Sequence, residues 1–186
     1  MRKLIIGITG TFGCGKTTAA KMLSKKAKII DADILAKRLA RKEKIRKRIF
    51  RQFKTSERKQ LARIVFSDHK KLKRLEAILH PEVRKEIKMI IKNSRKHVII
   101  DAPLLVEGKF LSLLDYLIVV ACDPEKRRNR LIKKGFSEQE IAARARFQLP
   151  EEKKISQADI VIDNSASRKQ TKKQVDIAWK RITKLM

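Results

Sequence analysis

The stretch that most limits how this chain can fold is GITGTFGCGKTTAA, residues 7–20. An apolar run, residues 3–9 (KLIIGIT), leads into its glycines, and helix-forming residues follow from Thr17 to about Lys26. Branched apolar residues in such a short run predict a buried strand. The stretch from Gly10 to Thr17 fits the pattern G-x-x-x-x-G-K-[ST], which requires a strand before it and a helix after it. The sequence therefore predicts a strand, a glycine loop and a helix at the start of an α/β fold.

The residue types in this loop indicate a nucleoside triphosphate as its ligand. Gly13 and Gly15 let the backbone approach a phosphate chain, and the amides of the loop and the helix N-terminus attract the anion. Lys16 reaches the β- and γ-phosphates, and the Thr17 hydroxyl is available to Mg²⁺. The predicted nucleotide-binding residues of the loop are Gly10, Gly13, Cys14, Gly15, Lys16, Thr17 and Thr18. Because Cys14 stands where a small side chain is needed, we expect it to pack rather than to react.

Four later apolar runs predict further buried strands: 28–33, 97–101, 115–122 and 158–163. Helical patterns separate these runs, which indicates a parallel sheet with helices on both faces. We therefore predict an α/β P-loop kinase-type fold over 1–186, with three layers and about five parallel strands.

Two segments of this fold are expected to stand apart from the sheet. From 34 to about 94 apolar residues recur at spacings of three and four, so a helical insertion is predicted over 34–96, with Pro81 beginning a new helix in it. Residues 124–148 are predicted to form a lid and its flanking helices. A basic helix there ends at Gly135, and Ser137 with Glu140 predicts the capping box of the next helix.

Carboxylates lie at the ends of two of the predicted strands. Asp31 and Asp33 end the second strand, at the sheet edge where α/β proteins bind ligands. A carboxylate there can accept the proton of an attacking hydroxyl or help to hold a metal, or it can simply cap the next helix. We predict Asp33 as the base. Asp101 ends a strand where P-loop enzymes keep an acid near Mg²⁺, so Thr17 and Asp101 are the predicted metal ligands.

The basic lid segment holds the cationic side chains Arg127, Arg128, Arg130, Lys133 and Lys134, with Arg144 and Gln148 on the next helix. A hinged cationic segment can close over phosphates and offset charge during transfer, although a solvated basic face is the alternative. The acceptor of the phosphoryl group stays open at this point. The chain has no N/T-K-x-D motif of guanine-nucleotide switches, and its length favours a small metabolite kinase.

The net charge of +28 is concentrated in one part of the chain. Residues 37–74 hold 17 Lys or Arg against 3 Asp or Glu, which attracts polyanions such as nucleic acid or phosphorylated metabolites. Only 5% of the residues are aromatic, which argues against nucleic acid as the main partner. No run of about 18 apolar residues occurs and no cleavage site follows the N-terminal run, so we expect no membrane span and a cytosolic protein.

Several segments together resemble the dephospho-coenzyme A kinases. They occur in the family's order and span almost the whole chain: GITGTFGCGKTTAA, IIDADILA, LEAILHPEVR, IIDAPLLVE, DYLIVVACDPEKRRNRL and QLPEEKKISQADIVIDN. The resemblance implies a P-loop core, a helical acceptor domain and a lid. It also implies transfer of the γ-phosphoryl of ATP, with Mg²⁺, to the 3′-hydroxyl of dephospho-coenzyme A.

The resemblance also implies roles for single residues. Catalysis would fall to Asp33 as base, with Lys16 and Arg130, and the lid maps to the region around 133–137. Arg144 and Asn164 would bind ATP, Asn164 near the adenine. The acceptor would contact residues on three segments: Asp31, Asp33, His80, Arg84, Pro103, Leu104 and Glu107.

The chain departs from the family pattern in three places. The stretch after Asp33 is compressed and very basic, Cys14 replaces the usual loop serine, and Lys133 and Lys134 stand where an arginine is common. The compressed stretch leaves two alternatives open: a kinase of the same fold acting on a nucleoside or nucleotide, and a basic P-loop protein that binds nucleic acid. The sequence carries no signal for an oligomeric state.

Overall fold

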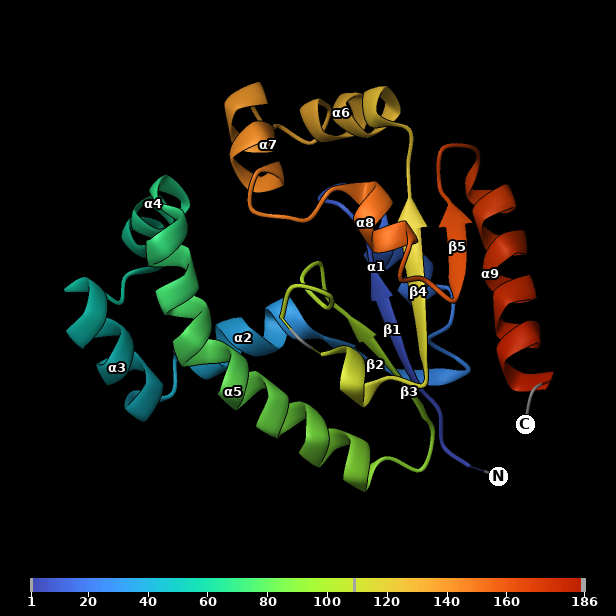
Figure 1. The fold of residues 1–186 in the computed structure, drawn as a ribbon, viewed down its shortest axis with the longest axis horizontal. Coiled ribbons are helices and arrows are strands. Elements are labelled where there is room, and N and C mark those ends of the chain that lie inside the picture. The colour runs from blue at the N-terminus through green and yellow to red at the C-terminus, as the bar shows by residue number, and fades with distance from the viewer. Residues whose placement is uncertain (1, 109, 185–186) are drawn as a thin grey trace. The chain divides into compact units, whose positions relative to one another are not determined.

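The structure, a computed structural model, describes residues 2–108 and 110–184 (Figure 1). Its sheet has five strands: β1 (Ile5–Thr9), β2 (Ala27–Asp31), β3 (His97–Asp101), β4 (Tyr116–Ala121) and β5 (Ile160–Asp163). Their order is β2-β3-β1-β4-β5, and β1 pairs in parallel with both β3 and β4, as β4 does with β5. The predicted α/β class and five-stranded sheet are confirmed. The strand expected over 28–33 ends earlier, at Asp31, because a helix begins directly after it.

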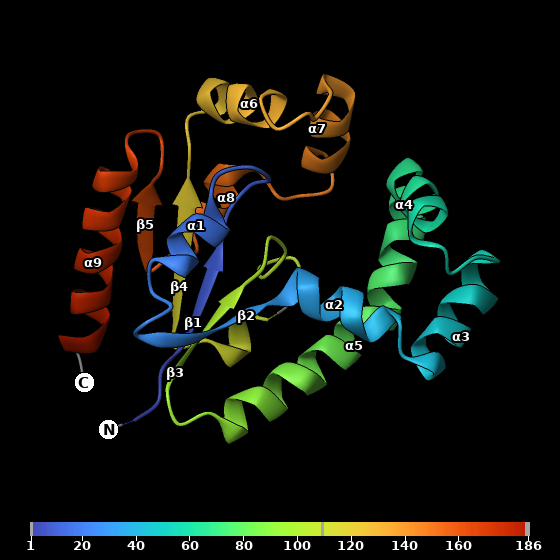
Figure 2. The same ribbon diagram turned by 180° about the vertical axis from the view of Figure 1, so that it is seen from behind.

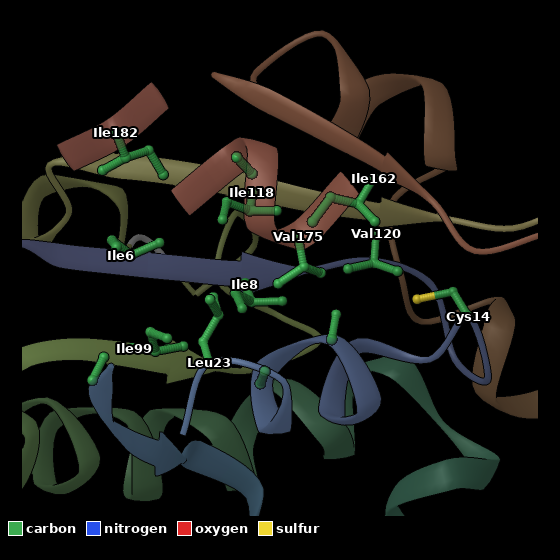
Figure 3. Close-up of a cluster of buried hydrophobic side chains, with 14 of the residues drawn as sticks. Ile6, Ile8, Cys14, Leu23, Ile99, Ile118, Val120, Ile162, Val175 and Ile182 are labelled. Carbon is green, nitrogen blue, oxygen red and sulfur yellow. The ribbon is translucent and has the colours of Figure 1, made fainter. Parts of the chain in front are cut away.

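The chain divides into two compact units, one up to Ile30 and from Ser94 onward, the other Asp31–Asn93. The first unit holds the sheet and its core. Helices α1 (Lys16–Lys21) and α9 (Arg168–Lys184) pack against alternate strand residues such as Ile6 and Ile8. Figure 3 shows these isoleucines with side chains from the other strands and from α9, and Cys14 at the edge of the same cluster. The glycine loop is therefore attached directly to the main core.

The remaining helices of the first unit follow β3 and β4. They are the short 3-10 helix η1 (Leu111–Leu113), α6 (Pro124–Ile132), α7 (Glu138–Ala145) and α8 (Glu151–Ile155). Helix α8 lies in front of the sheet in Figure 1, whereas α1 lies in front of it in Figure 2, so helices cover both faces. The predicted capping box begins α7: Ser137 Oγ accepts from the Glu140 amide at 3.2 Å, and the Ser137 amide donates to the Glu140 carboxylate at 3.0 Å.

The second unit is built from four helices: α2 (Ala32–Ala40), α3 (Glu43–Phe53), α4 (Arg58–Ser67) and α5 (His69–Asn93). Apolar side chains from all four are buried, among them Leu35, Ile49 and Val65. Ion pairs add to this packing, because Arg38 of α2 lies 2.9 Å from Glu86 of α5. No helix within the described ranges is both long enough and apolar enough to cross a membrane.

The prediction that Pro81 begins a helix is wrong, because α5 runs unbroken from His69 to Asn93 with Pro81 inside it. A proline within a helix removes one backbone hydrogen bond and costs about 3 kcal/mol. Val83 and Ile87, which follow on the same helix, are 2% and 0% exposed. Their burial against the neighbouring helices offsets the cost of the proline, and a rule based on local sequence cannot include that contribution.

Candidate active site

The glycine loop joins β1 to α1 in a backbone conformation that only glycine adopts easily. Gly15 caps α1 with φ of 98°, and a Cβ built there would lie 2.1 Å from Nδ2 of Asn164. At Gly10 a Cβ would lie 2.2 Å from the carbonyl oxygen of Val120. Both glycines therefore allow backbone to approach its neighbours where a side chain would collide. Glycine at these two positions is therefore what allows this loop conformation.

A hydroxyl and a carboxylate meet beside this loop. Thr17 lies in the first turn of α1, and its Oγ1 donates to Oδ2 of Asp101 at 2.8 Å. Asp101 ends β3, the strand next to β1, and is only 4% exposed. The two predicted metal ligands are thus brought together by the sheet order.

This pair of oxygens suits Mg²⁺. The ion prefers oxygen ligands and keeps several waters, so it needs one or two protein oxygens together with substrate phosphates. Among the described residues, no group of three or more His, Cys, Asp or Glu side chains forms a closed metal cage. Thr17 and Asp101 supply oxygens of the kind that Mg²⁺ takes from a protein when it binds together with a nucleotide.

Cationic and polar side chains hold the tip of the loop. Lys16 crosses the loop, and its Nζ donates to the carbonyl oxygen of Thr11 at 3.1 Å. Arg127 of α6 donates to the Thr11 hydroxyl at 2.6 Å, and that hydroxyl donates to Glu151 of α8 at 2.9 Å. The Phe12 amide donates to Oε1 of Gln148 at 2.8 Å. Segments that follow β4 thus fix a loop that follows β1.

Asn164, at the end of β5, fixes the other side of the loop. Its Nδ2 donates to the Cys14 carbonyl at 2.7 Å, and its Oδ1 accepts from the Thr171 hydroxyl at 2.7 Å. Arg130 donates to the backbone carbonyl of Asn164, also at 2.7 Å. The guanidinium of Arg130 therefore lies at the end of β5, whereas that of Arg127, also on α6, contacts the glycine loop.

The cysteine of the loop is a packing residue, as expected. Cys14 is 0% exposed and belongs to the main core cluster. Burial raises the pKa of its thiol above the ordinary value, although the nearby Lys16 opposes that effect. A thiol with a raised pKa stays protonated and is a poor nucleophile. The Cys14 side chain is therefore occupied by packing, and only its backbone is available to a ligand of the loop.

An ion pair with a buried lysine contacts the segment that follows β3. Lys154 of α8 is 0% exposed, and its Nζ donates to Glu107 Oε1 at 2.9 Å and to the Pro103 carbonyl at 2.7 Å. The same oxygen of Glu107 accepts from the Leu149 amide at 2.9 Å. Burial lowers the pKa of Lys154, and its bond to Glu107 opposes the shift. These bonds fix the segment from Pro103 to Glu107 to α8 and to the backbone just before it.

Lys154→Met is expected to lower the free energy of unfolding by about 3 kcal/mol, because it leaves the largely buried carboxylate of Glu107 without its cationic partner. The double variant Lys154→Met/Glu107→Leu removes both charges and is expected to recover most of that loss. Urea unfolding of the two variants measures the difference. A double variant that is as unstable as the single one would show that the charge left on Glu107 is not the cause.

In the second unit, the predicted acceptor residues occupy α2 and α5. Asp31 caps α2, where its Oδ1 accepts from the Ile34 amide at 2.8 Å, so the capping alternative is confirmed for this residue. Asp33 lies exposed in the first turn of the same helix. His80 and Arg84 lie one turn apart on α5 and line a surface groove of about 540 Å³. Burial lowers the pKa of His80, and the charge of Arg84 lowers it further.

Comparison with known proteins identifies the family. The family model for dephospho-CoA kinase matches residues 4–170. The chain belongs to the dephospho-CoA kinase family. A dephospho-CoA kinase of Aquifex aeolicus (strain VF5) is 40% identical over 191 residues, covering 96% of this chain and 97% of that protein. One of Bacillus cereus (strain ATCC 10987 / NRS 248) is 36% identical, with coverage of 95% and 96%.

Solved structures share the fold of this chain, and one of them is a named member of the same family. The crystal structure of TT1252 from Thermus thermophilus has a TM-score of 0.84 and 36% identity, covering 100% of this chain and 99% of that one. A dephospho-CoA kinase from Campylobacter jejuni gives 0.68 and 27%, with 98% of each chain covered. Shikimate kinase from Bacteroides thetaiotaomicron, at 0.57 and 16% identity, shares the fold alone.

The structure adds residues that the sequence patterns did not single out. Phe12, Glu151 and Lys154 had no predicted role, and Arg127 was one of several lid cations. Their positions depend on which strands are neighbours in the sheet. The only advance signal was the run of charges in 124–134 and 151–154, which does not distinguish an inward lysine from an outward one.

Proposed function

We propose that this chain transfers the γ-phosphoryl group of ATP to the 3′-hydroxyl of dephospho-coenzyme A, giving coenzyme A and ADP. The observation that carries the proposal is the Thr17–Asp101 pair, 2.8 Å apart at the glycine loop. It combines an anion-binding loop with oxygens for a metal, which phosphoryl transfer requires. Family membership supplies the acceptor, because the named relatives are dephospho-CoA kinases.

In this reaction the residues of the chain would have separate roles. The loop amides and Lys16 bind the triphosphate and offset the charge of the transferring group. Thr17 and Asp101 would hold Mg²⁺, which neutralises charge on the phosphate oxygens when it is bound. Asp33 accepts the proton of the 3′-hydroxyl as that oxygen attacks the γ-phosphorus, and the bond to the β-phosphate oxygen breaks to leave ADP.

The remaining assignments concern the lid and the acceptor. Arg144 is proposed to contact ATP, and Asn164 to support the nucleotide from the end of β5. Arg130, close to Asn164, would add positive charge there. The α5 groove with His80 and Arg84 suits the phosphates of a coenzyme A precursor because both side chains are hydrogen-bond donors. A cytoplasmic location stays our prediction.

An ADP-release assay tests this function directly. Mg-ATP is supplied with and without dephospho-coenzyme A, and the product is weighed by mass spectrometry. We expect ADP only when the acceptor is present, together with a product heavier by one phosphate group. Folded protein that binds ATP but releases no acceptor-dependent ADP would refute the proposal, and a panel of nucleosides and nucleotides would then identify the acceptor.

Asp101→Asn is expected to raise the Mg²⁺ concentration needed for half-maximal activity by about tenfold, because the residue loses its negative charge beside the Thr17 hydroxyl. The measurement is a Mg²⁺ titration at saturating ATP. Asp115→Asn, a change of the same kind before β4, serves as the matched control. An unchanged Mg²⁺ requirement in Asp101→Asn would contradict the metal assignment.

A further inference from the structure

The guanidinium of Arg144 lies between two phenylalanine rings. Its Cζ is 4.9 Å from the ring centroid of Phe12 and 4.6 Å from that of Phe136. The two rings meet edge to face, with centroids 5.3 Å apart and an interplanar angle of 85°. Phe12 belongs to the tip of the glycine loop, Phe136 to the turn after α6, and Arg144 to α7. Three separate segments thus meet at one cation.

One hydrogen-bond donor of this arginine is unsatisfied. Among the residues that the structure describes, Nη1 of Arg144 is buried and has no hydrogen-bond partner. Buried donors are nearly always satisfied, and leaving one unsatisfied is costly. With rings against it, a guanidinium can bond only through its edge, in its own plane. An anion bound in the adjacent glycine loop would provide the missing acceptor.

The same segment is attached to the loop at a second point. Gln148, one turn after Arg144, accepts from the Phe12 amide at 2.8 Å. The backbone of the loop tip and the ring of Phe12 are therefore both held by residues 144–148. Such double attachment fixes the distance between the arginine and the loop before any ligand arrives, which reduces the entropy lost on binding.

We propose that Phe12 and Phe136 are positioning residues that hold Arg144 between their rings, so that its Nη1 donates to a phosphate of the nucleotide in the glycine loop. The inference rests on the proposed function only for the identity of that nucleotide as ATP. Rings attract a guanidinium through their π faces, and an aliphatic side chain of similar size does not. We call this arrangement of Phe12, Phe136 and Arg144 the arginine clamp. The clamp depends on the aromatic character of the two side chains rather than on their size.

A double-mutant cycle on ATP affinity tests this clamp. Isothermal titration with ATP is run on F136L, R144A and the double variant. F136L is expected to weaken binding about fivefold and R144A about tenfold. The double variant is expected to match R144A, because Phe136 acts only through the arginine. F136Y, which keeps the ring, is expected to bind ATP as the wild type does. F12L is run in a cycle of its own with R144A and is expected to weaken ATP binding about fivefold, as F136L does.

F147L is the matched control. Phe147 lies under Arg146 with 4.7 Å between Cζ and the ring centroid, so the same kind of contact is removed on a neighbouring arginine. We expect its ATP affinity to be that of the wild type. Two results would overturn the clamp. One is a loss of ATP affinity in the double variant equal to the product of the two single losses, and the other is wild-type ATP affinity in both F136L and F12L. Since the titration needs no acceptor, it judges the clamp even if the ADP-release assay refutes the proposed function.

Discussion

Exchanging Asp33 for asparagine is expected to lower kcat by a factor of about 10² to 10⁴, the range over which general bases contribute. The asparagine has the same shape but cannot take the proton of the attacking hydroxyl. Asp33 lies exposed in the first turn of α2, where asparagine is tolerated, so the fold should be unaffected. Steady-state kinetics gives kcat, and titration with ATP is expected to show an affinity within about twofold of the wild type.

Asp68→Asn is the control for this change. Asp68 precedes α5, where its Oδ1 accepts from the Lys70 amide at 2.8 Å, and asparagine can make the same bond. It alters a carboxylate of the same unit without touching α2, so turnover should stay at the wild-type level. If Asp33→Asn also kept wild-type turnover, Asp33 would not be the base. If it lost ATP binding as well, its effect would be structural.

Lys16→Ala is expected to lower kcat/KM for ATP by about 10²- to 10³-fold, with losses in both kcat and ATP affinity. The lysine stands at the start of α1 and reaches across the loop to the Thr11 carbonyl at 3.1 Å. Bound phosphates would compete with the Thr11 carbonyl for the ammonium group of Lys16. The lysine would then stabilise both the bound ATP and the transition state, which is why ATP affinity and kcat are both expected to fall. Kinetics at varied ATP separates the two losses.

Lys21→Ala provides the matched control on the same helix. Lys21 ends α1 and is exposed, so its removal changes the net charge equally without altering the loop. We expect its kinetics to equal those of the wild type. Wild-type ATP affinity and turnover in Lys16→Ala would disprove the assignment of the glycine loop as the phosphate site.

Much of the fold was predictable because its signals are local. The strand, loop and helix at the N-terminus follow from apolar runs and glycine spacing, and the capping box at Ser137 follows from two residues three positions apart. Pro81 shows where local rules end. Its position before a helical run predicts a helix start, yet tertiary packing of α5 outweighs the cost of an interior proline.

The partners of the glycine loop were not predictable in the same way. Thr17 and Asp101 could be paired in advance, because Thr17 comes just after the loop that follows one strand, Asp101 ends another, and the fold class brings strand ends together. Arg127 and Asn164 reach the loop only because β4 is the neighbour of β1, and β5 of β4. Lys154 is buried, whereas lysine side chains are usually exposed. Nothing in the sequence around it distinguishes it from Lys153, which is exposed.

The bond from Asn164 to Cys14 has a consequence for the order in which the protein matures. It joins residues 150 positions apart, so the ribosome synthesises the loop well before the side chain that holds it. During synthesis the nascent chain carries GITGTFGCGKTT long before β5 emerges to hold it. Capacity to bind nucleotide should therefore arise only after Asn164 and Thr171 have left the ribosome, and a chain stalled before that point would be inert toward ATP.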